Sequence, residues 1–113
     1  MKLVVERTGA TVAERVEPAR TFWTRLVGLL GRANLAPDEG LLIDPCNSVH
    51  TLFMRFPIDV AFLDADGRVV RAIANLQPWR ATRIHSNARA TLELAAGTLA
   101  RIGIQEGDLL LER

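Results

Sequence analysis

The feature that most constrains the fold is a tight turn between two β-type segments, Asp64-Ala65-Asp66-Gly67. Residues 58–63 before the turn are apolar apart from Asp59, and residues 68–76 after it alternate between more and less apolar positions. An Asp-Gly pair between such segments is typical of a β-hairpin, because glycine readily adopts the positive φ that the turn requires. The sequence therefore predicts a hairpin over residues 58–76 that turns at residues 64–67.

Shorter β-type segments lie on both sides of this hairpin. Residues 3–5 and 11–16 surround the turn Thr8-Gly9-Ala10 and predict a second hairpin. Residues 98–103 predict one helical turn that ends at Gly103. Further short strands are predicted over residues 41–44, 89–94 and 109–112.

One segment has a helical period instead. Phe22, Leu26, Leu29 and Leu30 share one helical face, which predicts a helix over residues 20–30. Together the elements predict a mainly β (α+β) fold, a small β-barrel of short strands with one packed helix and one short C-terminal helical turn. A chain of 113 residues has the length of one domain, so we expect residues 1–113 to fold as a single domain.

The charge balance of the chain limits its partners. Fourteen basic residues face thirteen acidic ones, and the net charge of +1 creates no large field to attract nucleic acid or a membrane surface. We therefore expect neither as a partner. The N-terminal residues lack the apolar stretch of a signal peptide, and a single cysteine excludes an intrachain disulfide. These observations predict a cytoplasmic protein.

Five groups of residues resemble motifs of the bacterial and archaeal "domain of unknown function 192" family. The groups are residues 25–32, 40–43, 54–63, 92–97 and 103–108, and they include Pro57-Ile58-Asp59, Leu92-Glu93-Leu94 and Gly107-Asp108. The resemblance extends over nearly the whole chain from about Arg20. Many members carry Trp-Met where this chain has Phe53-Met54. Because the family is uncharacterised, the resemblance supports the fold and leaves the function open.

The rare reactive side chains gather between Pro45 and Pro57. Cys46 is the only cysteine and His50 is one of two histidines, and a spacing of four places both on one face of a strand or of a helix. A thiol activated by an imidazole is a nucleophile, so Cys46 and His50 are the candidate catalytic residues. The alternative is a small, partly buried thiol beside a hydrogen-bonded histidine. Met54 would extend the same face with a soft, adaptable wall.

Asp59 is a carboxylate inside an apolar strand, where a charge without a partner is costly. Arg55 and Arg71 are its candidate partners. Asp59 would be either a polar anchor at the floor of a ligand pocket or a structural group, paired with an arginine or bonded to backbone N–H groups.

Trp79 follows Pro78 and lies near Arg80 and Arg83, where it could stack on a planar ligand. The alternative role is to cover one end of the barrel. With these residues, the predicted ligand-binding set is His50, Met54, Asp59, Trp79 and His85.

Three functions stay open on this evidence. The favoured one is a small β-barrel protein that binds a small-molecule ligand or acts as an accessory protein, without chemistry of its own. The alternatives are a cysteine-dependent hydrolase or transferase that uses Cys46 and His50, and a partner-binding module that uses a barrel edge. A structural zinc site has four N or S ligands, and the chain has three Cys or His residues in all, so we expect no metal ion and no cofactor.

Overall fold

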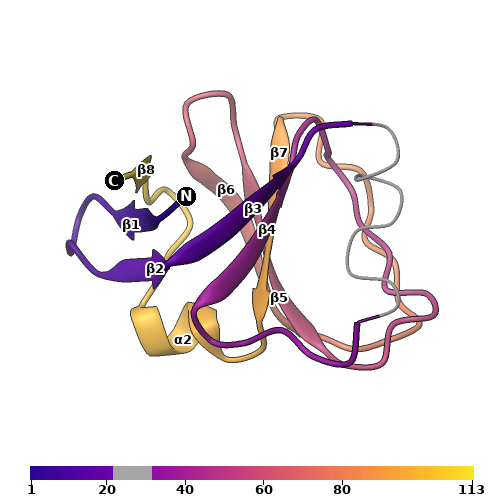
Figure 1. Cartoon of the computed structure of the whole chain (residues 1–113). Coiled ribbons are helices and arrows are strands. Elements are labelled where there is room, and N and C mark those ends of the chain that lie inside the picture. Colours follow the sequence, from indigo (N-terminus) through magenta and orange to yellow (C-terminus); the bar gives the residue numbers. More distant parts are fainter. Residues whose placement is uncertain (22–31) are drawn as a thin grey trace.

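The computed structural model describes residues 1–21 and 32–113 (Figure 1). The helix predicted over residues 20–30 lies almost entirely within residues 22–31, outside the described part of the chain. In chain order, the described elements are β1 (Leu3–Val5), β2 (Thr11–Ala13), β3 (Arg15–Ala19), β4 (Glu39–Ile43), β5 (Ile58–Leu63), β6 (Val69–Leu76), β7 (Ala90–Ala95), α2 (Thr98–Ile102) and β8 (Leu110–Glu112).

The strands form two sheets, which confirms the mainly β fold. One sheet has the order β2-β1-β8 and the other has the order β3-β4-β7-β5-β6 (Figure 1). The chain passes between the two sheets at Glu14. Elsewhere a bridge between Arg68 and Leu109 and isolated backbone hydrogen bonds join the sheets, such as the one from Val16 N–H to Met1 O at 2.7 Å. Among the described residues these links do not make a continuous ladder, so the predicted closure into one barrel is corrected to two sheets.

The predicted hairpin is confirmed, because β5 and β6 pair antiparallel across the turn at residues 64–67. Gly67 has a φ of 90°, and its N–H donates to the Asp64 carbonyl at 3.1 Å. The Asp64 carboxylate closes the turn by accepting hydrogen bonds from the N–H groups of Asp66 and Arg68, both at 2.9 Å. Asp64 thus supplies the local hydrogen bonding that makes such turn residues effective.

Every residue of β5 is buried, because each face of the larger sheet is covered by its own apolar cluster. Ala61 and Leu63 belong to the cluster between the two sheets. Val60 and Phe62 belong to the cluster on the opposite face. Residues from the segment between β4 and β5 cover this second cluster; they are Cys46, Val49, Met54 and Phe56.

The N-terminal segment differs from the prediction of one strand over residues 11–16. The chain leaves the smaller sheet at Glu14 and continues as β3, which runs parallel to β4 at the edge of the larger sheet. Pro18 lies within β3, a position that proline tolerates because an edge strand leaves one row of N–H positions unused. The other predicted strands and the helical turn at residues 98–103 are found within two residues of their expected bounds.

No helix in the described part of the chain is both long enough and apolar enough to cross a bilayer.

Candidate functional site

Two loops run side by side on the right of Figure 1, on the side of the larger sheet away from β1 and β8. We call residues 45–57, which join β4 to β5, and residues 77–89, which join β6 to β7, the loop pair. Three backbone hydrogen bonds of 2.8 Å hold the two segments antiparallel. They run from His85 N–H to Asn47 O, from Thr82 N–H to Val49 O, and from Thr51 N–H to Arg80 O.

Thr51 fixes the end of the loop pair that carries Trp79. Its side chain is fully buried, and Oγ1 donates to the Gln77 carbonyl at 2.6 Å and accepts from the Arg80 N–H at 2.9 Å. The Thr51 carbonyl also accepts a hydrogen bond from the Trp79 N–H at 2.9 Å. Buried groups bonded on all sides in this way form a rigid support, so the backbone on both sides of Trp79 is held in one conformation.

Phe53 and Trp79 project from this support into solvent as an aromatic pair. Phe53 is 69% exposed and Trp79 is 56% exposed, and their ring centroids lie 4.7 Å apart with a 60° angle between the planes. Both residues have positive φ, 66° for Phe53 and 64° for Trp79. Bulky residues rarely adopt this conformation, and such strain gathers at functional sites. Two strained backbone positions therefore hold two large apolar side chains out of the core.

The loop pair carries basic residues and no acidic ones. Its 26 residues contain no Asp or Glu, whereas all thirteen acidic residues and ten of the fourteen basic residues lie elsewhere in the chain. Arg89 forms an ion pair with Asp44 at 3.0 Å. Arg55, Arg80 and Arg83 are exposed, and none forms an ion pair with a described residue. The near-neutral total charge therefore conceals a basic surface on one side of the molecule.

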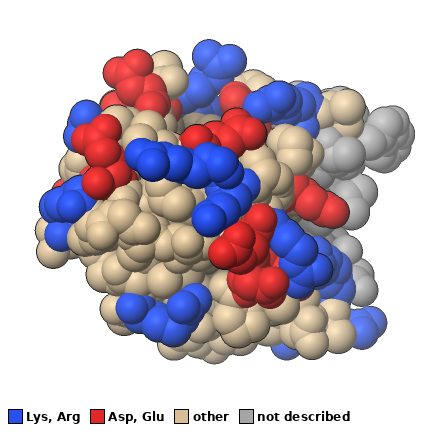
Figure 2. All heavy atoms as spheres, turned by 60° about the vertical axis from the view of Figure 1, so that its left-hand side comes forward, with Lys and Arg blue, Asp and Glu red and all other residues tan. Residues whose placement is uncertain are grey.

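The face turned forward in Figure 2 includes the side of β1, β2, β8 and α2, and its charged side chains are distributed differently from those of the loop pair. There acidic and basic side chains are interleaved, with uncharged surface between them. Arg7 is paired with Asp108 at 2.7 Å, and Arg71 lies 3.7 Å from Glu106. Mixed charges of this kind create little net field, unlike the unmatched arginines of the loop pair.

Cys46, His50 and Met54 all lie on the loop pair but have different environments. The Cys46 thiol donates to the Ser48 carbonyl at 3.0 Å, and the residue borders a shallow hollow. His50 is exposed, and Met54 is buried in the cluster beneath the loops. The one-face argument for Cys46 and His50 assumed regular structure, whereas the chain between them is irregular. No hydrogen bond joins the thiol to this imidazole among the described contacts.

His85 turns inward from the second loop. Its ring lies 4.4 Å from the Phe62 ring at 41°, and Nε2 is shielded from solvent with no hydrogen-bond partner among the described residues. Burial lowers the pKa of His85, and the positive charges of Arg83 and Arg71 lower it further. The neutral imidazole of His85 therefore packs on the Phe62 ring beneath the loop pair.

Asp59 lies apart from the loop pair and serves the framework. It is fully buried, and its carboxylate accepts hydrogen bonds from the Asn75 N–H and the Leu99 N–H, both at 2.8 Å. The prediction that Asp59 is buried and hydrogen-bonded is confirmed. The proposed arginine partners are corrected, because neither Arg55 nor Arg71 bonds to it. Since both oxygens are occupied, Asp59 ties the end of β6 to the first turn of α2.

Glu93 was not singled out from the sequence as a site residue, yet it is the least expected group in the core. It lies in the middle of β7, opposite Leu41 and Val60, and is only 4% exposed. Its Oε2 has no hydrogen-bond partner in the described chain. Burial raises the pKa of Glu93 to about 7. Its neighbours Leu92 and Leu94 face the opposite cluster. Such alternation is typical of a strand with one exposed face, whereas this sheet is covered on both faces.

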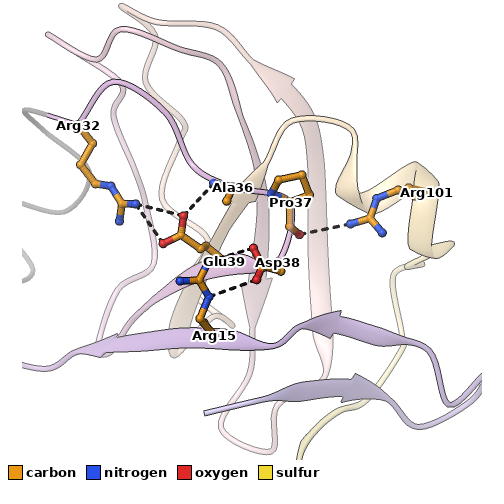
Figure 3. A network of polar contacts seen from close by, with 7 residues as sticks. All are labelled: Arg15, Arg32, Ala36, Pro37, Asp38, Glu39 and Arg101. Carbon is orange, nitrogen blue, oxygen red and sulfur yellow. Dashed lines mark hydrogen bonds and ion pairs between the residues drawn. The ribbon is translucent and has the colours of Figure 1, made fainter.

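A separate polar network lies at the start of β4 (Figure 3). Arg15 donates to both oxygens of Asp38 at 3.2 and 3.1 Å. Arg32 donates to both oxygens of Glu39, at 3.4 and 3.2 Å, and the Ala36 N–H donates to Oε1 at 3.0 Å. The Ala36 N–H, more than Arg32, lowers the pKa of Glu39. Because both carboxylates are paired, this network fastens the approach to β4 and offers no free group for chemistry.

Comparisons with known proteins point to one family. The family model of DUF192, described as "Uncharacterized ACR", matches residues 3–111. A "UPF0127 protein" from Thermococcus gammatolerans is 31% identical over 115 residues, which cover 96% of this chain and 72% of that protein.

Solved structures of similar proteins share the fold. A protein of unknown function from Novosphingobium aromaticivorans has a TM-score of 0.87 and is 28% identical, covering 99% of this chain and 84% of that one. A proposed transcription regulator from Sinorhizobium meliloti has a TM-score of 0.81 and is 29% identical, covering 97% and 89% of the two chains.

Proposed function

The chain belongs to the uncharacterised DUF192 family, and from this premise we propose that it is an accessory protein that binds a partner protein through the loop pair, without chemistry of its own. The resemblance seen in the sequence is thereby confirmed. Membership assigns no activity, so the proposal depends on the loop pair itself. The cytoplasmic location remains a prediction.

The observation that carries the proposal is the exposed Phe53–Trp79 pair. Removing large aromatic side chains from water is favourable, so an exposed pair of them offers binding energy to a partner that can cover it. Here positive φ at both residues and the buried Thr51 support keep the pair outside the core. A preformed anchor of this kind loses little conformational entropy on binding, which favours affinity.

The composition of the loop pair agrees with a protein interface. The residues that contribute most to binding at interfaces are enriched in Trp and Arg, and interface cores are depleted in Asp and Glu. The loop pair has one Trp, two Phe and four Arg, with no acidic residue. The absence of Lys from the loop pair does not count as support for an interface, because Lys2 is the only lysine in the whole sequence.

A small-molecule site has less support in the described residues. Small ligands bind in concave, mostly enclosed pockets. The hollow beside Cys46 is shallow and is lined by only five residues, Pro45, Cys46, Asn47, Ala88 and Arg89. The aromatic pair protrudes instead, which suits insertion into a partner better than enclosure of a ligand.

A cysteine enzyme also has less support than a binding protein. A nucleophilic thiol needs a base within hydrogen-bond reach. The Cys46 thiol is directed to the Ser48 carbonyl, which accepts a hydrogen bond but cannot remove the proton. His50, the proposed base, lies exposed on the other side of an irregular segment.

Affinity purification from the source cells tests the proposal, with the tagged wild-type chain and the variants Phe53→Ser and Trp79→Ser. We expect one partner at stoichiometric level with the wild type, lost with both variants, and able to bind again when purified and mixed with the wild-type chain. Ile84→Ser is the matched control, because Ile84 is also 69% exposed on the loop pair but is not part of the aromatic pair. A partner retained equally by all three variants would contradict the assignment.

A further inference from the structure

We propose that the partner surface is acidic: a protein segment with an apolar socket for Phe53 and Trp79, bordered by carboxylates that pair with Arg55, Arg80 and Arg83. This inference rests on the proposed function and specifies its partner.

Arg55, Arg80 and Arg83 have no acidic partner within the described chain. Five other arginines do form ion pairs with Asp or Glu; they are Arg7, Arg15, Arg32, Arg71 and Arg89. Elsewhere on the surface, basic residues without an ion pair are accompanied by acidic residues without one, such as Glu14 and Glu17, whereas the loop pair contains no acidic residue to balance its three unpaired arginines. A complementary surface must supply negative charge there.

The three arginines are close in sequence to the aromatic pair or to each other. Arg55 is two residues from Phe53, and Arg80 directly follows Trp79. The backbone N–H of Arg80 is held by Thr51 Oγ1 at 2.9 Å, so the base of this side chain is fixed. Arg83 lies three residues further along the same loop. Guanidinium groups pair with carboxylates through two parallel hydrogen bonds, which adds geometric selectivity to the attraction.

The packing of the aromatic pair and the number of arginines beside it favour a protein over nucleic acid or a membrane as the acidic partner. Single-stranded nucleic acid binds to aromatic side chains that offer open faces to the bases, whereas Phe53 and Trp79 pack against each other at 4.7 Å. Anionic membranes recruit clusters of roughly four to eight basic residues, more than the three unpaired arginines here. A compact aromatic anchor with a few arginines beside it matches the residues that dominate protein–protein binding.

Selection from a random 12-residue phage-displayed peptide library tests the inference. The wild-type chain is the bait, and the Phe53→Ser/Trp79→Ser double variant is used to remove peptides that bind elsewhere. We expect the retained peptides to be net negative and to contain at least one large apolar residue. For synthetic copies, we expect each of Arg55→Glu, Arg80→Glu and Arg83→Glu to weaken binding about tenfold, because a favourable charge pair becomes repulsive.

Matched variants distinguish weaker binding caused by the changed charge from weaker binding caused by a loss of folding. The corresponding Arg→Lys variants retain the charge but lose the paired hydrogen bonds of the guanidinium, and they should bind more tightly than the Arg→Glu variants and more weakly than the wild type. Arg113→Glu changes an exposed arginine on the far side of the molecule and should leave the affinity unchanged. Retained peptides that are neutral or basic, or that bind the Arg→Glu variants as well as the wild type, would overturn the acidic-partner inference and leave the proposed function standing. A selection that yields no peptide discriminating the wild type from the double variant would contradict the proposed function as well.

Two defined probes cover the other anionic partners. They are vesicles of 30% phosphatidylserine in phosphatidylcholine and a 20-nucleotide single-stranded DNA. We expect both to bind more weakly than the selected peptides at physiological salt. Tighter binding of either probe, lost in the Arg→Glu variants, would overturn the choice of a protein partner.

Discussion

At the residue scale, two of the buried carboxylates, Asp59 and Glu93, have opposite arrangements. Asp59 has a backbone N–H for each oxygen, whereas Glu93 Oε2 has no partner in the described chain. A charged group that is buried without a partner is costly, so burial raises the pKa of Glu93 to about 7 and the neutral form predominates below that pH. The two residues therefore make different predictions for stability.

Glu93 should make stability depend on pH. In the folded chain its pKa is about 7, against 4.5 for the unperturbed group. Between these values the folded state keeps a proton that the unfolded state has lost, so stability falls as pH rises from 4.5 to 7, by at most about 3 kcal/mol. Glu93→Gln cannot ionise, and we expect its free energy of unfolding to rise relative to wild type over this window. Urea unfolding at several pH values measures the difference; a constant difference would mean that Glu93 is charged in the folded state.

Asp59 should be needed for stability at neutral pH. Asp59→Ala leaves the buried N–H of Leu99 and the partly buried N–H of Asn75 without an acceptor, at a cost of about 3 kcal/mol. Asp66→Ala is the control, since Asp66 is exposed in the turn. Chemical denaturation of both variants checks the expectation. Equal midpoints would show that α2 and β6 do not depend on this carboxylate.

At this scale the sequence revealed Asp59 but not Glu93. An aspartate inside an apolar segment, Ile58-Asp59-Val60, is conspicuous because the neighbours on both sides require burial. A glutamate that alternates with leucines is typical of a strand with one exposed face. Only the second apolar cluster, which includes residues distant in sequence such as Ala19 and Leu35, shows that this face is covered.

At the element scale, the hairpin of β5 and β6 could be predicted because the residues that determine it are close together in the sequence. Turn chemistry and alternation are both contained within residues 58–76. β3 was missed because its partner is β4, a parallel strand some twenty residues away, and because Pro18 is a poor signal for a strand. The expected barrel was not found because closure depends on how the sheet edges meet, which no local pattern specifies.

The turn at Gly67 also joins the two sheets, and this gives a prediction. Gly67 has a φ of 90°, and a Cβ there would lie 3.0 Å from the Leu110 carbonyl oxygen. Gly9 has a φ of 75° with no atom within 4 Å of such a Cβ. Both alanine variants should be strained, by about 1 kcal/mol from φ alone, and Gly67→Ala should lose more because of the contact. Thermal unfolding compares them; equal losses would mean that the Leu110 strand moves away freely.

At the scale of the whole molecule, the larger sheet is a support that presents the loop pair at one side. Asp59 and the hairpin stabilise this support, and Val49 and Met54 attach the loops to its second cluster. The sequence predicted one site from Cys46, His50, Met54, Asp59, Trp79 and His85. Five of these residues lie on the loop pair, whereas Asp59 lies in β5 and bonds to the backbone of Asn75 and Leu99. The sequence did not reveal that Phe53 meets Trp79, because that contact depends on the antiparallel course of two irregular segments.

The central claim is that the aromatic pair, and not the cysteine, is the functional surface. The most direct test is the dissociation constant of the purified partner for the wild type, Trp79→Ala and Cys46→Ser, measured by isothermal titration calorimetry. We predict at least about tenfold weaker binding for Trp79→Ala, or about 1.4 kcal/mol, since an anchoring tryptophan contributes this much or more. Cys46→Ser should bind within about twofold of wild type, because its side chain lies outside the aromatic pair. Full affinity in Trp79→Ala, or loss of binding in Cys46→Ser alone, would contradict the account.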